Sequence, residues 1–158
     1  MLILFGSLLL IPFALNFIAS RDDYRRYVDA LFISGMLAGI WAFTNGIATL
    51  WPFPENKQWH PLIDLIGLSV VVAAYMTQKQ RWKLLLAFLF LAQLLTHVWF
   101  WAHDPASRGS IGREYVGTLN LLWFAQLGCV AWSGGVHCVA RTLDVLRRHR
   151  RLPDLVRH

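Results

Sequence analysis

Six polar side chains stand inside stretches of the chain that are otherwise apolar, and they are the groups best able to do chemistry. His60 and Asp64 are four residues apart, so a helix places both on one face. Imidazole and carboxylate groups on neighbouring helices can bind a divalent metal ion or relay protons. This candidate polar site consists of His60, Asp64, Gln93, His97, Asn45 and Asn120.

Three interpretations of the polar site are open. In the first, Asp64 and His97 make structural hydrogen bonds while His60 is solvated near the membrane surface. In the second, the site binds a divalent metal ion or carries protons. In the third, His60 and His97 hold a haem, which requires two facing imidazoles at matched depth. No compact motif such as HExxH or CxxC occurs, so we predict no cofactor and leave the metal open.

Long apolar runs are the elements that must position these residues. Hydrophobic residues make up 56% of the 158 residues, and charged residues make up 15%, well below the roughly 25% of soluble domains. The run 84–102 reaches roughly 28 Å as a helix, which is close to the thickness of the hydrocarbon core of a bilayer. We therefore predict an all-α, polytopic transmembrane helix bundle over residues 1–140. Its five spans are predicted at residues 2–19, 27–51, 61–77, 84–102 and 116–140.

Lys and Arg residues alternate between the predicted loops. Twelve of the fifteen fall in the first loop, the third loop and the C-terminal segment, and three fall in the other two loops. Because cytoplasmic loops are enriched in Lys and Arg, we predict an N-out/C-in orientation with a basic cytoplasmic tail over residues 141–158. The tail is expected to continue the last helix to about Leu152 and to bind anionic lipid headgroups. The headgroup contacts are predicted for Arg147, Arg148, Arg150 and Arg151.

A stripe of small residues follows one face of the second predicted span. Gly35 and Gly39 form a GxxxG motif, and the spacing of four and three residues continues through Ala42, Gly46 and Thr49. Small residues let helices approach closely, and van der Waals contact then drives their association in lipid. The stripe therefore packs either against another helix of the same bundle or against a second copy of the chain.

Sequence motifs give no sign of a soluble enzyme. No nucleophile elbow, phosphate-binding loop or dinucleotide fingerprint occurs, and no predicted loop is longer than about 13 residues, so we predict a protein that is not an enzyme. The formal charge of +6 reflects membrane topology, and no nucleic-acid partner is expected. The leading hypothesis is a small protein of the bacterial inner membrane, either an accessory subunit or a small transporter-like bundle, in a homo-oligomer or a larger membrane complex. The alternatives are a holin-like phage protein that forms membrane lesions, and a haem- or metal-binding redox subunit.

Overall fold

The computed structural model describes residues 2–44, 60–103 and 108–155, and side chains within residues 8–147 of these ranges. The described chain is all-helical, with five helices. They are α1 (Leu2–Asp22), α2 (Tyr24–Ala42), α4 (His60–Thr77), α5 (Arg81–Ala102) and α6 (Arg108–Leu155). Each predicted span overlaps one of these helices, although residues 45–51 of the second predicted span lie outside the described residues.

The boundaries of α6 differ from the prediction at both ends. We expected a loop over residues 103–115, but α6 already begins at Arg108. Glycines at positions 109 and 112 disfavour a helix here, yet tertiary contacts with α5 outweigh them: Tyr115 stacks on Phe100 with ring centroids 4.0 Å apart. At its other end the helix continues to Leu155, so residues 141–155 of the predicted tail extend α6 without a break.

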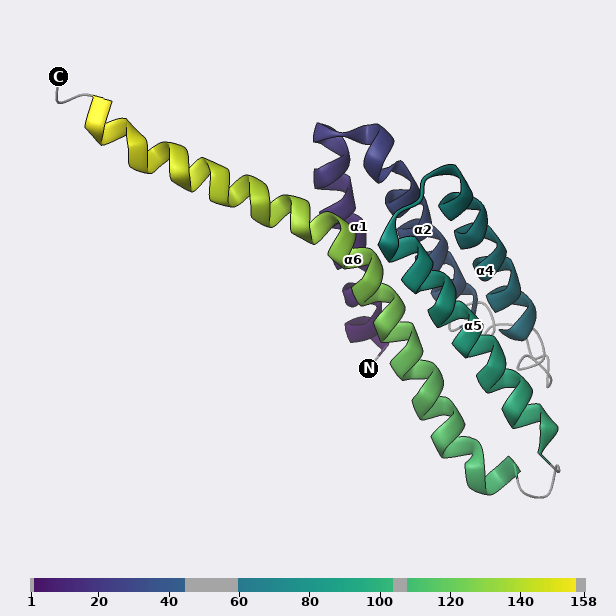
Figure 1. The fold of residues 1–158 in the computed structure, drawn as a ribbon. Coiled ribbons are helices and arrows are strands. Elements are labelled where there is room, and N and C mark those ends of the chain that lie inside the picture. The colour runs from purple at the N-terminus through teal and green to yellow at the C-terminus, as the bar shows by residue number, and fades with distance from the viewer. Residues whose placement is uncertain (1, 45–59, 104–107, 156–158) are drawn as a thin grey trace.

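Two helical hairpins and one long helix make up the bundle (Figure 1). Helices α1 and α2 pack against each other, as do α4 and α5, whereas the contact between α2 and α4 is slight. Helix α6 packs against both α1 and α5, so it joins the two hairpins. Its C-terminal part then leaves the bundle and extends alone, as Figure 1 shows in yellow.

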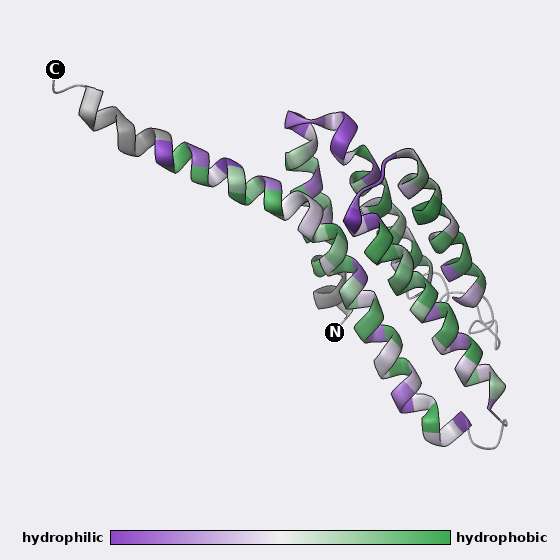
Figure 2. Ribbon diagram, viewed as in Figure 1, coloured by the Kyte–Doolittle hydropathy of each residue, from purple (hydrophilic) through white to green (hydrophobic). Residues whose placement is uncertain are grey.

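The surface of the bundle is apolar. Many large hydrophobic side chains are exposed, among them Leu121 and Met76, and hydrophobic residues predominate along α4, α5 and the bundle part of α6 (Figure 2). Three helical segments of the described chain are long and apolar enough to cross a membrane. They are His60–Thr77, Arg81–Ala102 and Arg108–Arg147. These observations are consistent with an integral membrane protein. Five spans and the N-out/C-in orientation stay predictions.

The two basic turns of the chain lie together at one end of the bundle. The Gln78 side chain donates to the carbonyl of Arg25 at 2.9 Å, and that of Gln80 donates to the carbonyl of Arg26 at 3.4 Å. Figure 2 shows hydrophilic residues gathered at this end. We call it the basic end. It is the end that the charge alternation predicts to be cytoplasmic.

An apolar core fills the bundle between two levels of polar residues. Along the buried side of α5, Lys83 stands near the basic end, Leu86 and Phe90 follow, and His97 comes last. Phe90 packs so closely on α4 that a Cβ atom added at Gly67 would lie 2.5 Å from its ring. The core cluster contains Leu9, Ile33, Leu37, Val71, Leu86, Phe90, Leu127, Cys129 and Val130.

The small-residue stripe of α2 does not pack within the bundle that the structure describes. Gly35, Gly39 and Ala42 are exposed, and no described atom lies within 4 Å of a Cβ atom added at either glycine. Gly46 lies outside the described residues. The close helix approach occurs instead at Gly134 of α6, where a Cβ atom would lie 2.7 Å from the backbone of Leu15 in α1.

Candidate functional site

Asp64 is the centre of a buried hydrogen-bond network. It lies one turn into α4, and only 4% of its surface is exposed. Its Oδ2 atom lies 2.8 Å from Nε2 of His97, and its Oδ1 atom accepts a hydrogen bond from the Gln93 amide at 3.1 Å. Both partners come from α5, one helical turn apart. The carboxylate is therefore held by two groups on the neighbouring helix.

His97 connects the carboxylate to the third helix of the site. Its ring is 1% exposed, and its Nδ1 atom lies 2.6 Å from the hydroxyl of Tyr115 on α6. A neutral ring accepts at one of these nitrogens and donates at the other, whereas an imidazolium donates at both. In either form His97 has an orienting partner on each side.

The network continues from α5 into the centre of α6. The buried Gln126 side chain donates through Nε2 to Oε1 of Gln93 at 2.8 Å. Gln93 in turn donates to Asp64. Gln93 therefore accepts one hydrogen bond and donates the next, and Asp64 is the acceptor at the end of this chain.

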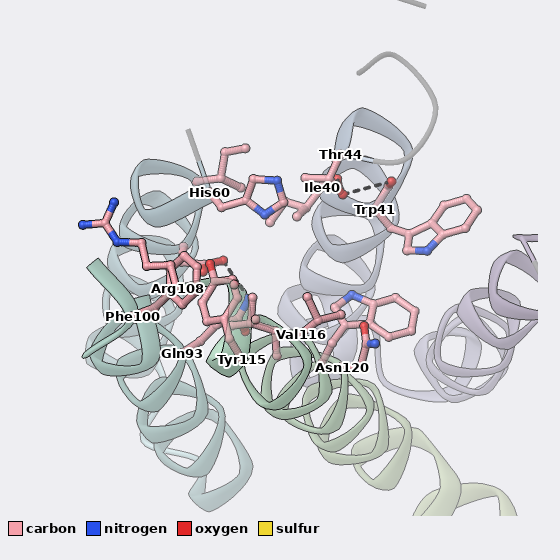
Figure 3. A pocket seen from close by; sticks show the side chains of 16 residues that line it. Ile40, Trp41, Thr44, His60, Gln93, Phe100, Arg108, Tyr115, Val116 and Asn120 are labelled. Atoms are coloured by element: carbon pink, nitrogen blue, oxygen red, sulfur yellow. Dashed lines mark hydrogen bonds between the residues drawn. The ribbon is translucent and has the colours of Figure 1, made fainter. Parts of the chain in front are cut away.

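A cleft of about 690 Å³ lies beside this network. It is bounded by α2, α4, α5 and α6, and the side chains of His60, Asn120 and Tyr115 converge on it (Figure 3). The His60 ring meets that of His97 edge to face, with centroids 6.2 Å apart. Asp64 and Gln93 form part of the wall. The cleft is thus large enough for a small molecule and has a carboxylate in its lining.

Arg108 borders the cleft, but its guanidinium is engaged elsewhere. Its Nε and Nη2 atoms donate to the carbonyls of His103 and Trp101 at 3.0 and 2.9 Å. The group also lies 4.7 Å from the centre of the Trp101 ring, a cation–π distance. In Figure 3 it points away from Tyr115 and Asn120. Arg108 therefore fastens the start of α6 to the end of α5.

The structure brings together three of the six polar residues and places two others nearby. Asp64, Gln93 and His97 are directly hydrogen-bonded, and His60 and Asn120 line the same cleft. Asn45 lies outside the described residues. Tyr115 and Gln126 were not predicted as site residues. Tyr115 fell in a predicted loop. Gln126 lies six residues after Asn120 in the predicted last span, and its polar side chain inside an apolar run was the signal that could have identified it.

A buried ion pair lies at the basic end, on the other side of the apolar core. The Lys83 ammonium is fully buried and pairs with Asp29 of α2. It also donates to the carbonyls of Ala74 at 3.0 Å and Gln78 at 3.3 Å. Lys83 was predicted to lie in a basic loop, because charge alone does not show which way a side chain at the start of a helix points.

A second charged cluster joins α1 to α6 at the same end. Asp22 accepts from His137 at 2.9 Å and from Arg141 at 2.7 Å. The hydrogen bond with His137, together with the positive charge of Arg141, lowers the pKa of Asp22 below its usual value of 3.8. The cluster ties the end of the first hairpin helix to the point where α6 leaves the bundle.

Ligation of a metal or haem by His97 would disturb the network. Both ring nitrogens of His97 already have partners, so a haem iron would have to replace either Asp64 or Tyr115. Within the described residues, no three His, Cys, Asp or Glu side chains are grouped closely enough to hold a metal ion. The haem and metal hypotheses remain predictions without a matching donor set in this part of the chain.

The chain matches no family model, no curated protein and no solved structure.

Proposed function

We propose that this chain is a non-enzymatic, transporter-like protein of the bacterial inner membrane, with the cleft beside Asp64 and His97 as its substrate pocket. One observation carries the proposal: a buried carboxylate, imidazole and phenol from three helices lie beside a cleft of about 690 Å³. Ionisable residues inside membrane helices are costly, and they commonly mark substrate or proton pathways.

The two polar levels of the bundle fit this role. The cleft belongs to the level of Asp64 and His97, and the apolar side chains of Phe90 and Leu86 separate that level from the Lys83–Asp29 pair. A substrate pocket that is open to one side and closed toward the other is the resting arrangement that alternating access requires. The slight contact between α2 and α4 supplies a boundary along which the hairpins can move.

Accessibility of the cleft to water tests the proposal. Asn120 is exposed on the cleft side of α6, while the adjacent Leu121 is 70% exposed on the outer surface. In a chain whose native Cys129 and Cys138 are replaced by alanine, we would introduce Asn120→Cys and, as a matched control, Leu121→Cys. A membrane-impermeant thiol reagent is then applied to each side of oriented membrane vesicles.

The expected result is that Asn120→Cys reacts from the predicted outer side only and that Leu121→Cys does not react. Labelling of neither position would show that no aqueous pocket exists here and would overturn the proposal. Equal labelling of both positions would place this part of α6 outside the bilayer and would have the same consequence. The accessory-subunit alternative predicts instead that the chain co-purifies with a larger membrane protein that covers the cleft.

A second candidate, a holin-like lesion former, is favoured by the exposed stripe of α2. Gly35 and Gly39 offer a close-approach surface that the described bundle leaves uncovered. Inducible expression with a membrane-potential dye tests this candidate. If the chain forms lesions through α2, then Gly35→Leu and Gly39→Leu abolish depolarisation, whereas Gly128→Leu, at an equally uncrowded glycine of α6, leaves it intact. Quiet growth of cells that make the wild-type chain removes this candidate.

A further inference from the structure

Asp64 presents both of its carboxyl oxygens to neighbouring side chains inside the bundle. Its Oδ1 atom accepts a hydrogen bond from the Gln93 amide, and its Oδ2 atom lies 2.8 Å from Nε2 of His97. When His97 is neutral and Asp64 carries no proton, this network has one negative charge, on a side chain that is 4% exposed.

Within the described residues, no Lys or Arg side chain neutralises this charge. Lys83 pairs with Asp29 across the apolar core, and Arg108 is bound to two carbonyls and the Trp101 ring. A carboxylate held inside a membrane bundle needs a positive partner, because burying an unpaired charge is expensive. A proton, or a cation in the adjacent cleft, would supply this positive charge.

The cleft lining indicates what kind of cation fits. The wall contains the aromatic side chains of Phe100, Tyr115, Trp123 and Trp41. Aliphatic side chains, such as Ile63 next to Asp64 in the sequence, and polar side chains make up the rest. Aromatic faces attract cations whose charge is spread over an apolar body, and they do not replace the hydration shell of a small metal ion. The volume of about 690 Å³ matches a drug-sized molecule.

We propose that the cleft binds a hydrophobic organic cation, and that this cation and a proton compete for Asp64. The inference rests on the proposed transporter-like function and adds the substrate class to it. With the cleft empty, the Asp64–His97 pair holds one additional proton. When the cation binds, the pair releases that proton to water, so one positive charge replaces another and the net charge of the site stays constant.

The groups that face the pair define this exchange. Besides Asp64 itself, α4 contributes His60, whose ring lies 6.2 Å from the His97 ring, and α6 contributes the Tyr115 hydroxyl and the engaged Arg108. Helix α5 contributes His97 with the neutral Gln93. The described part of α2 lines the cleft with Ile40, Trp41 and Thr44, which do not titrate. The exchanged proton is assigned to Asp64 and His97 together, because the two side chains are in direct contact.

Two probe ions of the same shape and opposite charge test the proposal. Binding of radiolabelled tetraphenylphosphonium and of tetraphenylborate to the purified full chain in lipid nanodiscs is measured by equilibrium dialysis, with empty nanodiscs subtracted. Tetraphenylphosphonium is expected to bind saturably at one site per chain and at least about tenfold more tightly than tetraphenylborate. In weakly buffered solution about one proton should be released per bound cation. The Kd of tetraphenylphosphonium should rise about tenfold for each unit by which the pH falls, in the pH range where the Asp64–His97 pair is protonated.

Substitutions locate the site of competition. Asp64→Asn should weaken tetraphenylphosphonium binding at least about tenfold and abolish proton release. Asp64→Glu, which keeps the charge, should retain more affinity than Asp64→Asn. Asp144→Asn is the matched control, because Asp144 is an exposed carboxylate on the extended part of α6, and this variant should bind like the wild type. Circular dichroism and gel filtration verify that each variant is folded, and proton release by the wild type tests the exchange even if Asp64→Asn does not fold.

The outcomes separate this inference from the function on which it rests. Equal binding of the two probe ions, unchanged binding by folded Asp64→Asn, or binding without proton release would each overturn the organic-cation proposal. Absence of saturable tetraphenylphosphonium binding would also overturn it. If Asn120→Cys is nevertheless labelled from one side, the cleft stands as an aqueous pocket for another class of substrate. If labelling fails as well, both proposals fall.

Discussion

Replacing Gly134 with alanine should separate α1 from α6. The added Cβ atom would lie 2.7 Å from the carbonyl carbon and oxygen of Leu15 and 2.8 Å from the backbone nitrogen of Asn16. No rotamer change can relieve these contacts, because all three atoms belong to the backbone. An ordinary contact of about 3.4 Å is restored only if the helices move apart by roughly 0.7 Å.

That movement would also break polar contacts across the same interface. The Asn16 side chain donates to the carbonyl of Val130 at 3.0 Å, and the Ser133 hydroxyl donates to Asn16 at 2.6 Å. Hydrogen bonds between membrane helices average about 0.6 kcal/mol each. Overpacking in a core costs about 1–3 kcal/mol. Together these terms lower the free energy of unfolding by roughly 2–4 kcal/mol, which corresponds to a fall in Tm of roughly 5–15 °C for a chain of this size.

The native cysteines provide the assay. Cys129 is buried and both cysteines are free thiols, so a dye that fluoresces on reaction with thiols reports unfolding of the detergent-solubilised chain during heating. Gly135→Ala is the control, because the nearest atom to its added Cβ is 3.9 Å away. The close approach of α1 and α6 is refuted if Gly134→Ala melts within about 1 °C of Gly135→Ala and the wild type.

Three further outcomes are expected. Lys83→Met should leave Asp29 without its Lys83 partner and lower the free energy of unfolding by about 3 kcal/mol, which is near the low end for buried ion pairs because Asp29 is a quarter exposed. The control Lys79→Met should change the free energy of unfolding little, and denaturant titration of both variants measures the difference. Because folding lowers the pKa of Asp22, the contribution of Asp22 to stability is present above pH 3.8 and is lost as the pH falls through the lowered pKa. The difference in Tm between the wild type and Asp22→Asn should therefore be present at pH 7 and should shrink as the pH falls below the lowered pKa of Asp22. Residues 141–155 are expected to bind an anionic leaflet, so their amide hydrogen exchange should be slower in phosphatidylglycerol nanodiscs than in phosphatidylcholine nanodiscs, and equal rates would contradict this.

The helical nature of the chain could be predicted from the sequence because the apolar runs have the length that a helix needs to cross the hydrocarbon core of a bilayer. The pairing of His60 and Asp64 on one face of a helix follows from helical spacing, and their depth near His97 follows from the order of the spans. In the structure, hydrogen bonds join Asp64 to Gln93 and place Nε2 of His97 against the same carboxyl group. Whether this gathering has a function stays a proposal.

The remaining features depend on how helices rotate and approach, which local sequence does not specify. The GxxxG motif at Gly35 and Gly39 predicts a close approach but not its partner, and in the described bundle that approach occurs at Gly134 instead. The burial of Lys83 depends on the carbonyls of Ala74 and Gln78, which only the packed turn between α4 and α5 presents. The early start of α6 likewise depends on the stack of Tyr115 on the preceding helix.

The long last helix has a consequence for how the protein is made. A ribosome delivers helices in chain order, so both hairpins leave it before α6 does. The two hairpins have little direct contact, and α6 supplies most of what holds them together. Until α6 is synthesised, the carboxylate of Asp64 lacks the Tyr115 branch of its network and the cleft lacks one wall. The polar site therefore assembles last, and a nascent chain that stalls before Arg108 would present two separate hairpins to the quality-control proteases of the membrane.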